Sequence, residues 1–102
     1  MELNINQQGD TVKITIIGNV DERGAETLKT RFRELNVSQV KDLSFDFSQV
    51  SHIGSAGIGK LLLFYKDLAI NGGKISVYNV SDSIYELFNV LKLDTIFNIT
   101  KG

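Results

Sequence analysis

The chain has 102 residues, and its 11 Lys and Arg residues nearly balance its 12 Asp and Glu residues, for a formal net charge of -1. This length predicts one domain, residues 1–102, and the lack of a basic excess argues against binding to nucleic acid through its phosphates. Cysteine is absent and there is one histidine, which excludes disulfides and a structural zinc site, so we expect no cofactor and no metal.

The sequence also contains no recognisable signal peptide or membrane-spanning segment. The first residues lack the basic and then apolar segments of a signal peptide. The longest uninterrupted apolar run, residues 61–65, is far too short to span a bilayer. We therefore expect a cytoplasmic protein with no membrane partner.

The first third of the chain predicts a hairpin followed by a helix. Apolar and polar residues alternate over residues 3–6 and 12–16, with the turn residues Gln-Gly-Asp at positions 8–10 between them. Asp21 is a suitable N-cap for the helix that follows. The helix is indicated by apolar residues at helical spacing: Ala25, Leu28, Phe32 and Leu35.

The rest of the chain alternates between strand and helix patterns. Strands are predicted at residues 43–47, 74–78 and 96–99, and helices at residues 55–70 and from Ser81 or Asp82 to about residue 91. A broad apolar stripe on the helix at 55–70 predicts a core contact, and exposed members such as Phe64 are candidates for contact with a partner. This order predicts an α/β single domain with a mixed, mostly parallel sheet of four to five strands and helices packed on it.

The segment Gly54-Ser55-Ala56-Gly57-Ile58-Gly59 is the most informative part of the chain. It delivers one serine, Ser55, between small residues at the start of an apolar helix. Small neighbours leave a hydroxyl uncovered, and a helix N-terminus favours negative charge beside it. This arrangement suits a serine that another protein must reach and modify, although Ser55 could also act only as an N-cap.

Two enzyme interpretations of the same segment are weaker. Residues 54–60 fit the Gly-x-x-x-x-Gly-Lys part of a phosphate loop, but Leu61 stands where a hydroxyl would hold magnesium. The serine hydrolase turn fails as well, because Ile53 occupies its first glycine position. His52 lies in the same turn as Ser55, so a surface or packing role is expected for it. We predict that the protein is not an enzyme, with a nucleotide hydrolase as a remote alternative.

Four features together resemble the STAS family, and in particular the small bacterial anti-sigma factor antagonists. They are the turn at residues 18–21 with its helix, the central strand at 43–50, the segment at 54–59, and the glycine turn at 71–74. The resemblance covers nearly the whole chain and implies the STAS fold. Two positions depart from the family pattern: Gly54 stands where Asp is common, and Ala56 where a second Ser or Thr is common.

The resemblance also implies a function. Such antagonists bind an anti-sigma factor, often a serine protein kinase, and so release a sigma factor for transcription. The kinase phosphorylates the motif serine, which matches Ser55 here, and a serine phosphatase reverses the modification. The partner-binding residues implied are Asp21, Gly54, Ser55, Ala56 and Gly57. The alternative is a STAS module that is not phosphorylated and serves as a scaffold or as a sensor for a protein or small ligand.

Overall fold

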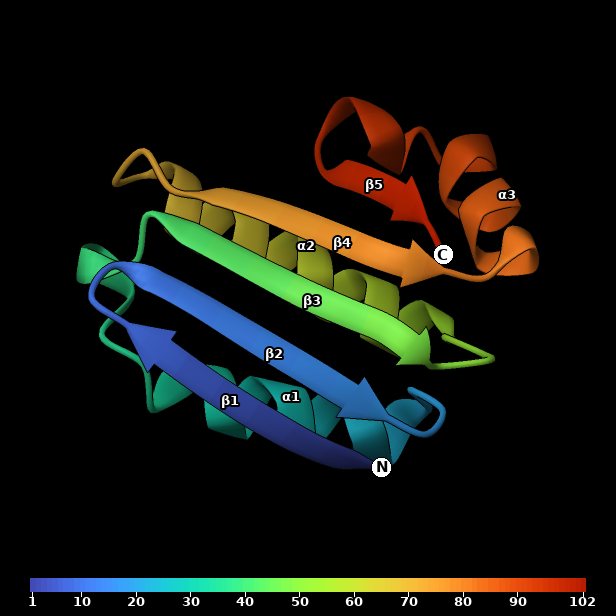
Figure 1. Ribbon diagram of the computed structural model, residues 1–102, viewed down its shortest axis with the longest axis horizontal. Helices are drawn as coiled ribbons and strands as arrows, with labels where there is room; N and C mark the ends of the chain where they lie inside the picture. Colours follow the sequence, from blue (N-terminus) through green and yellow to red (C-terminus); the bar gives the residue numbers. More distant parts are fainter.

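A five-stranded sheet forms the centre of the computed structural model, which describes residues 1–102. The strands lie side by side in chain order (Figure 1). β1 is antiparallel to β2 and all later neighbours are parallel, which confirms the predicted hairpin and mostly parallel sheet. In chain order the elements are β1 (Glu2–Gln8), β2 (Thr11–Ile17), α1 (Glu22–Arg33), the 3-10 turn η1 (Val37–Gln39), β3 (Asp42–Gln49), α2 (Ser55–Ala69), β4 (Lys74–Val80), α3 (Asp82–Val90), the 3-10 turn η2 (Leu93–Thr95) and β5 (Asn98–Lys101).

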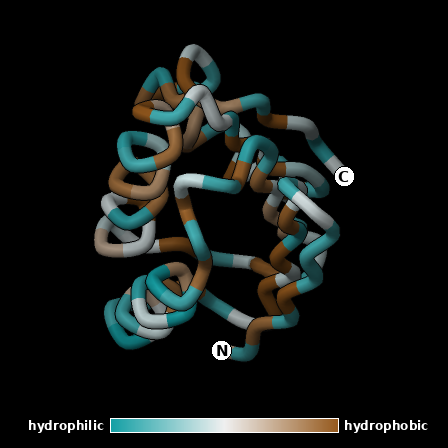
Figure 2. Tube along the Cα trace, turned by 90° about the vertical axis from the view of Figure 1, so that its left-hand side faces the viewer, coloured by the Kyte–Doolittle hydropathy of each residue, from teal (hydrophilic) through white to brown (hydrophobic).

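The helices form a second layer on one face of the sheet. Figure 1 shows α1 and α2 behind the strands, and the side view in Figure 2 shows the helical layer on one side of them. Alternate residues of the central strands are buried against this layer, for example Ile14 and Phe45, while Lys13 and Ser44 lie on the other face. The alternation of apolar and polar residues along these strands therefore places the apolar residues in the core and the polar residues on the open face of the sheet.

Aromatic residues fill the middle of the core. The Phe64 ring stacks on Phe32 of α1 at a centroid distance of 4.0 Å and lies 6.4 Å from the ring of Phe45 on β3. Phe64 is 1% exposed. The expectation that Phe64 serves a partner is wrong, because this side of α2 faces the groove between α1 and the sheet. Leu62 and Leu63, on the outer side of α2, are the partly exposed residues instead.

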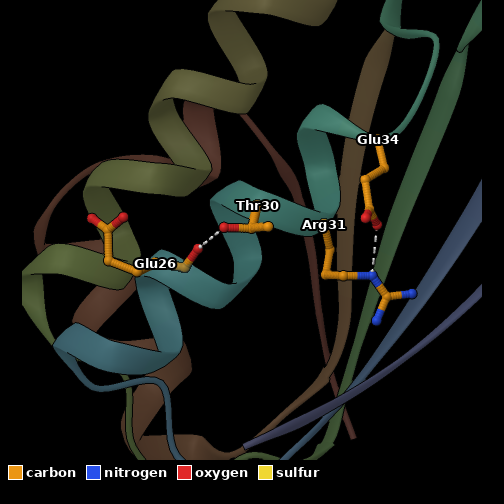
Figure 3. A network of polar contacts seen from close by, with 4 residues as sticks. All are labelled: Glu26, Thr30, Arg31 and Glu34. Atoms are coloured by element: carbon orange, nitrogen blue, oxygen red, sulfur yellow. Dashed lines mark hydrogen bonds and ion pairs between the residues drawn. The ribbon is translucent and has the colours of Figure 1, made fainter.

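The outer surface of α1 carries local polar contacts. The Thr30 hydroxyl donates to the Glu26 carbonyl oxygen at 3.0 Å, and the Arg31 Nε donates to the Glu34 carboxylate at 3.0 Å (Figure 3). Both pairs are exposed, so each contributes little to the free energy of folding. They occupy the face of α1 that the apolar spacing leaves to solvent.

The C-terminal strand differs from its expected position. Sequence alternation predicts a strand at residues 96–99, whereas η2 and a turn continue to Phe97 and β5 begins at Asn98. Phe97 is buried and packs edge-to-face on Tyr65 of α2, with ring centroids 5.9 Å apart. This tertiary contact holds the segment in a turn until the chain reaches the sheet edge beside β4.

Candidate functional site

The loop after β2 and the loop after β3 are joined by backbone hydrogen bonds at the carboxyl ends of these strands. The Gly18 N–H donates to the Gln49 carbonyl at 3.0 Å, and the Val20 N–H donates to the His52 carbonyl at 2.9 Å. The Gly54 N–H then donates back to the Val20 carbonyl at 2.9 Å. Val20 and Ile53 form an isolated parallel bridge, so the pairing of β2 with β3 is resumed beyond the ends of both strands.

One side-chain contact reinforces the same junction. The Ser51 hydroxyl donates to the Asn19 side-chain oxygen at 2.6 Å. Because residues 18–21 lead into α1 and residues 50–54 lead into α2, these contacts bring the N-termini of the two helices together.

A shallow hollow of about 530 Å³ lies between the two helix starts. The residues that line it are Asp21, Glu22, His52, Gly54, Ser55 and Ala56. Four of the five residues implied by the family resemblance therefore share one surface. The fifth, Gly57, is buried beneath it.

Ser55 is the first residue of α2 and is exposed. The N-cap is Gly54, in an extended conformation with φ -88° and ψ 176°, and it supplies no side-chain hydrogen bond. The interpretation of Ser55 as an N-cap is therefore wrong by one residue. The N–H groups of Ser55, Ala56 and Gly57 have no acceptor in the chain, so the start of α2 presents unpaired donors beside a free hydroxyl.

Asp21 is the N-cap of α1, as its sequence position predicts. Its Oδ1 accepts a hydrogen bond of 2.8 Å from the Gly24 N–H. Asp21 is nevertheless exposed, and the other carboxylate oxygen remains available on the surface of the hollow. Capping and partner contact are compatible roles for this residue.

Gly57 is required by close packing. A Cβ at this position would lie 2.7 Å from Val20 Cγ1 and 2.9 Å from Ile53 Cγ1. Both neighbours are core residues that cannot be displaced without opening the junction between the loops. By contrast, a Cβ at Gly59 would meet nothing within 4 Å.

Two further residues of the hollow, Glu22 and His52, are not among the site residues predicted from the sequence. Glu22 is of a type common in the first turn of any helix, and for His52 a surface or packing role was expected. With Asp21, Glu22 gives the hollow two carboxylates, and no Lys or Arg lines it. Only the bridge between Val20 and Ile53, which pairs loops far apart in the sequence, brings these residues to the same surface.

A second polar cluster supports β3 just before the loop. Asp46 accepts hydrogen bonds from the Ser48 N–H at 2.9 Å and from the Asn79 amide at 3.2 Å. Burial alone would raise the pKa of Asp46, but these bonds and the charge of Lys13 hold it below its ordinary value. The cluster ties the end of β3 to the end of β4, where Asn79 adopts a left-handed φ of 59°.

Lys60, the lysine of the partial phosphate-loop pattern, points elsewhere. Its Nζ lies 3.6 Å from the Glu26 carboxylate of α1, so it joins the two helices rather than the loop at residues 54–57. Within the chain, the geometry of residues 54–60 is that of a helix start packed on a neighbouring helix.

The chain resembles proteins that antagonise anti-sigma factors. It is 25% identical over 100 residues to the anti-sigma-B factor antagonist of Bacillus subtilis (strain 168), an alignment that covers 98% of this chain and 91% of that protein. Its fold matches a structure of the anti-sigma factor antagonist SpoIIAA in its unphosphorylated form, with a TM-score of 0.78 at 17% identity over 99% of this chain and 88% of the other. It also matches a crystal structure from Thermotoga maritima described as a putative anti-sigma factor antagonist, with a TM-score of 0.86 at 15% identity over 98% of this chain and 86% of the other.

None of the helices has the length and apolar character that crossing a membrane requires. Residues 2–101 match the STAS domain, and the order of strands and helices along the chain is the one that the resemblance implies. The chain therefore belongs to the STAS domain family.

Proposed function

We propose that this protein is an anti-sigma factor antagonist that acts in the cytoplasm as a phosphoregulated binding switch. Its partner is an anti-sigma factor that is also a serine protein kinase, and a serine phosphatase resets the switch. The hollow between the starts of α1 and α2 is the contact surface, with Asp21, Gly54, Ser55 and Ala56 on it and Gly57 supporting it from below. The protein itself catalyses no reaction.

The observation that carries the proposal is the position of Ser55. Its hydroxyl is exposed at the first position of α2, between Gly54 and Ala56, which are too small to cover it. A kinase can therefore reach the hydroxyl without unfolding the helix. The relative in Bacillus subtilis is an anti-sigma factor antagonist, and SpoIIAA, whose unphosphorylated form has the same fold, is another, so both support this assignment.

The surroundings of Ser55 allow phosphorylation to change binding without unfolding the protein. A phosphoryl group adds about -1.5 to -2 charges at pH 7. The unpaired N–H groups of Ala56 and Gly57, together with the helix dipole, favour this charge where it forms. On the hollow, however, the new group meets Asp21 and Glu22 and no cation of this chain.

The switch then follows from desolvation. A partner that covers the hollow must remove water from the phosphoryl group. Burying an uncompensated charge costs several kcal/mol, while a micromolar complex is held together by only about 8 kcal/mol. The bulk of the group also separates two surfaces that must touch. Phosphorylation of Ser55 is thus expected to abolish the complex and leave the fold intact.

The decisive experiment is phosphotransfer from the cognate anti-sigma kinase with ATP, followed by mass-spectrometric mapping. We expect one phosphate on Ser55, no phosphate on the Ser55→Ala variant, and normal phosphorylation of the control variant Ser48→Ala, which keeps the backbone N–H that bonds to Asp46. Phosphate on Ser48 or Ser51 would contradict the proposal. Tight binding to the kinase with no phosphorylation at all would favour the alternative, a STAS module used as a scaffold or sensor.

A further inference from the structure

β1 is an edge strand whose outer side no other part of the chain covers. All of its residues, Glu2–Gln8, pair with β2 in one unbroken register. No loop, turn or side-chain group donates to or accepts from the β1 backbone. Figure 1 shows no further strand beside β1 at this border of the sheet. Such an edge exposes a row of unpaired donors and acceptors to any other strand.

The opposite edge of the sheet is protected, and the difference is informative. β5 has four residues, its register with β4 shifts between Val77 and Val80, and α3 and η2 pack against it. It also ends in a lysine, Lys101. Short length, irregular register, cover and charge are the usual means by which proteins block edge pairing. β1 has seven residues, an unbroken register and no cover, and its sequence ELNINQQ contains no Lys, Arg or Pro; Glu2, at its first position, is its only charged side chain.

The hairpin determines which backbone groups of β1 point outward. Its two-residue loop is Gly9-Asp10, with Gly9 at φ +62°, so Gln8 and Thr11 form the closing hydrogen-bonded pair. Hydrogen-bonded and non-bonded pairs alternate along an antiparallel ladder. The even-numbered residues of β1 therefore bond to β2. The N–H and C=O groups of Leu3, Ile5 and Gln7 face away from the sheet.

We propose that β1 pairs with β1 of a second copy of this chain, antiparallel and about a two-fold axis at Ile5. Only Leu3, Ile5 and Gln7, whose backbone groups point outward, can form hydrogen-bonded pairs with the second copy. The symmetric register that uses all three residues places Leu3 opposite the partner's Gln7 and Ile5 opposite the partner's Ile5. The two sheets then become one continuous ten-stranded sheet. This assembly goes beyond the proposed switch, because Ser55 follows β3, two strands away from this edge.

The side chains are complementary in this register. On the helix face, Leu3 and Ile5 are half-buried at the border of the core, and pairing covers them with the partner's Ile5 and Gln7. On the open face, Asn4 lies opposite the partner's Asn6, so amide groups meet amide groups. Glu2 lies opposite the partner's Gln8, and no two like charges face each other. A symmetric pair of identical strands forms a closed dimer rather than an open chain of molecules.

Engineered cysteines test the register directly, because the natural chain has none. Asn4→Cys protein is mixed with Asn6→Cys protein in a glutathione redox buffer, and each variant is also incubated alone. Non-bonded antiparallel partners have Cα atoms about 4.5 Å apart, within disulfide range, whereas residues two positions out of register are too distant. We expect a disulfide-linked dimer in the mixture and only trace amounts with either variant alone. Equal cross-linking in all three samples, or none in the mixture, would overturn the proposal.

Sedimentation equilibrium tests the pairing without cysteine. The parent chain is expected to dimerise reversibly with concentration. Gln7→Pro removes one outward N–H but no bond to β2, and proline is tolerated at such an edge position. We expect Gln7→Pro to sediment as a monomer with the parent circular dichroism spectrum, while the matched Gln7→Ala variant still dimerises. A monomeric parent chain at all accessible concentrations, or a Gln7→Pro variant that dimerises like the parent, would contradict the proposal.

Discussion

Val20 and Ile53 form a parallel bridge that joins the loop after β2 to the loop after β3, and the side chains of both residues press on Gly57 at the first turn of α2. Val20 is 0% exposed and Ile53 is 3% exposed, so the bridge is part of the core. The same contact that closes the core therefore sets the position of Ser55, two residues before Gly57. A substitution at Val20, Ile53 or Gly57 is therefore expected to change both the packing of the core and the position of Ser55.

Gly57→Ala is expected to destabilise the protein. The new methyl group would lie 2.7 Å from Val20 Cγ1 and 2.9 Å from Ile53 Cγ1, so one or both side chains must leave their positions. Overpacking of this kind costs about 1–3 kcal/mol of unfolding free energy, more than the higher helix propensity of alanine returns. Urea denaturation measures the difference.

The matched control is Gly59→Ala in the next turn of the same helix. No atom lies within 4 Å of the added Cβ, and the residue is exposed. Alanine should therefore raise the unfolding free energy by about 0.5–1 kcal/mol. If Gly57→Ala raises the urea midpoint as Gly59→Ala does, close packing against Val20 and Ile53 does not require glycine at position 57.

Substitutions at Ser55 separate folding from binding. Ser55→Asp places a charge beside the unpaired N–H groups at the start of α2, so its melting temperature should equal or exceed that of the parent chain. On the proposed mechanism it fails to bind the anti-sigma partner, whereas Ser55→Ala binds and resists inactivation by the kinase. Calorimetric titration beside a circular dichroism melt measures both properties. If the Ser55→Asp variant binds as well as the parent chain, a negative charge at position 55 does not control binding, and the proposed mechanism is wrong.

Asp21 can be tested as a contact residue without loss of its cap. Asp21→Asn keeps an oxygen that accepts from the Gly24 N–H, and Asn is as good an N-cap as Asp. We expect its unfolding free energy to stay within about 0.5 kcal/mol of the parent, while affinity for the partner falls because one carboxylate of the hollow is gone. Asp21→Ala, which also removes the cap, should cost about 1 kcal/mol of stability in addition. If the Asp21→Asn variant binds the partner with unchanged affinity, Asp21 serves only as the N-cap of α1 and is not a contact residue.

The Asp46 cluster predicts an acid dependence of stability. Hydrogen bonds from Ser48 and Asn79 and the charge of Lys13 lower the pKa of Asp46 below the ordinary 3.8 despite its partial burial. A lowered folded-state pKa stabilises the protein above the unfolded-state value, and this contribution is lost as the pH falls through the folded-state value. Asp46→Ala should therefore cost up to about 1 kcal/mol at pH 7, since the group is partly open to water. The difference from the parent should shrink between pH 4 and pH 2 in pH-dependent urea melts, and a constant difference would show that lost packing is responsible.

The sequence predicted the elements well where local physics is decisive. Alternation over residues 12–16 and 43–47 gave the two central strands, and Asp21 and Ser81 cap α1 and α3 as their residue types indicate. Gly72 and Gly73 follow the end of α2 as predicted, with Gly72 at φ 76°. The STAS fold and the neighbouring positions of Asp21 and Ser55 were both accessible from motif order.

Other features depended on contacts between distant parts of the chain. Phe64 was expected at the surface, yet the rings of Phe32 and Phe45 enclose it. The last strand starts later than its alternation suggests because Phe97 packs on Tyr65. Phe64 and Phe97 are apolar whether they are buried or exposed. Composition and hydrophobic periodicity therefore cannot predict which distant residues will cover them.

By itself, then, the sequence determined which segments become strands and helices, because capping, turn chemistry and periodicity act over a few residues. Only the tertiary structure decided that Glu22 and His52 share a hollow with Ser55, and that Gly54 rather than Ser55 caps α2. Those outcomes depend on the bridge between Val20 and Ile53, a contact across 33 positions of sequence whose register is set by the packing of β2 on β3. The conformational preferences of neighbouring residues do not specify that register. It is set when the apolar residues of β2 and β3 come to lie on the same buried face of the sheet.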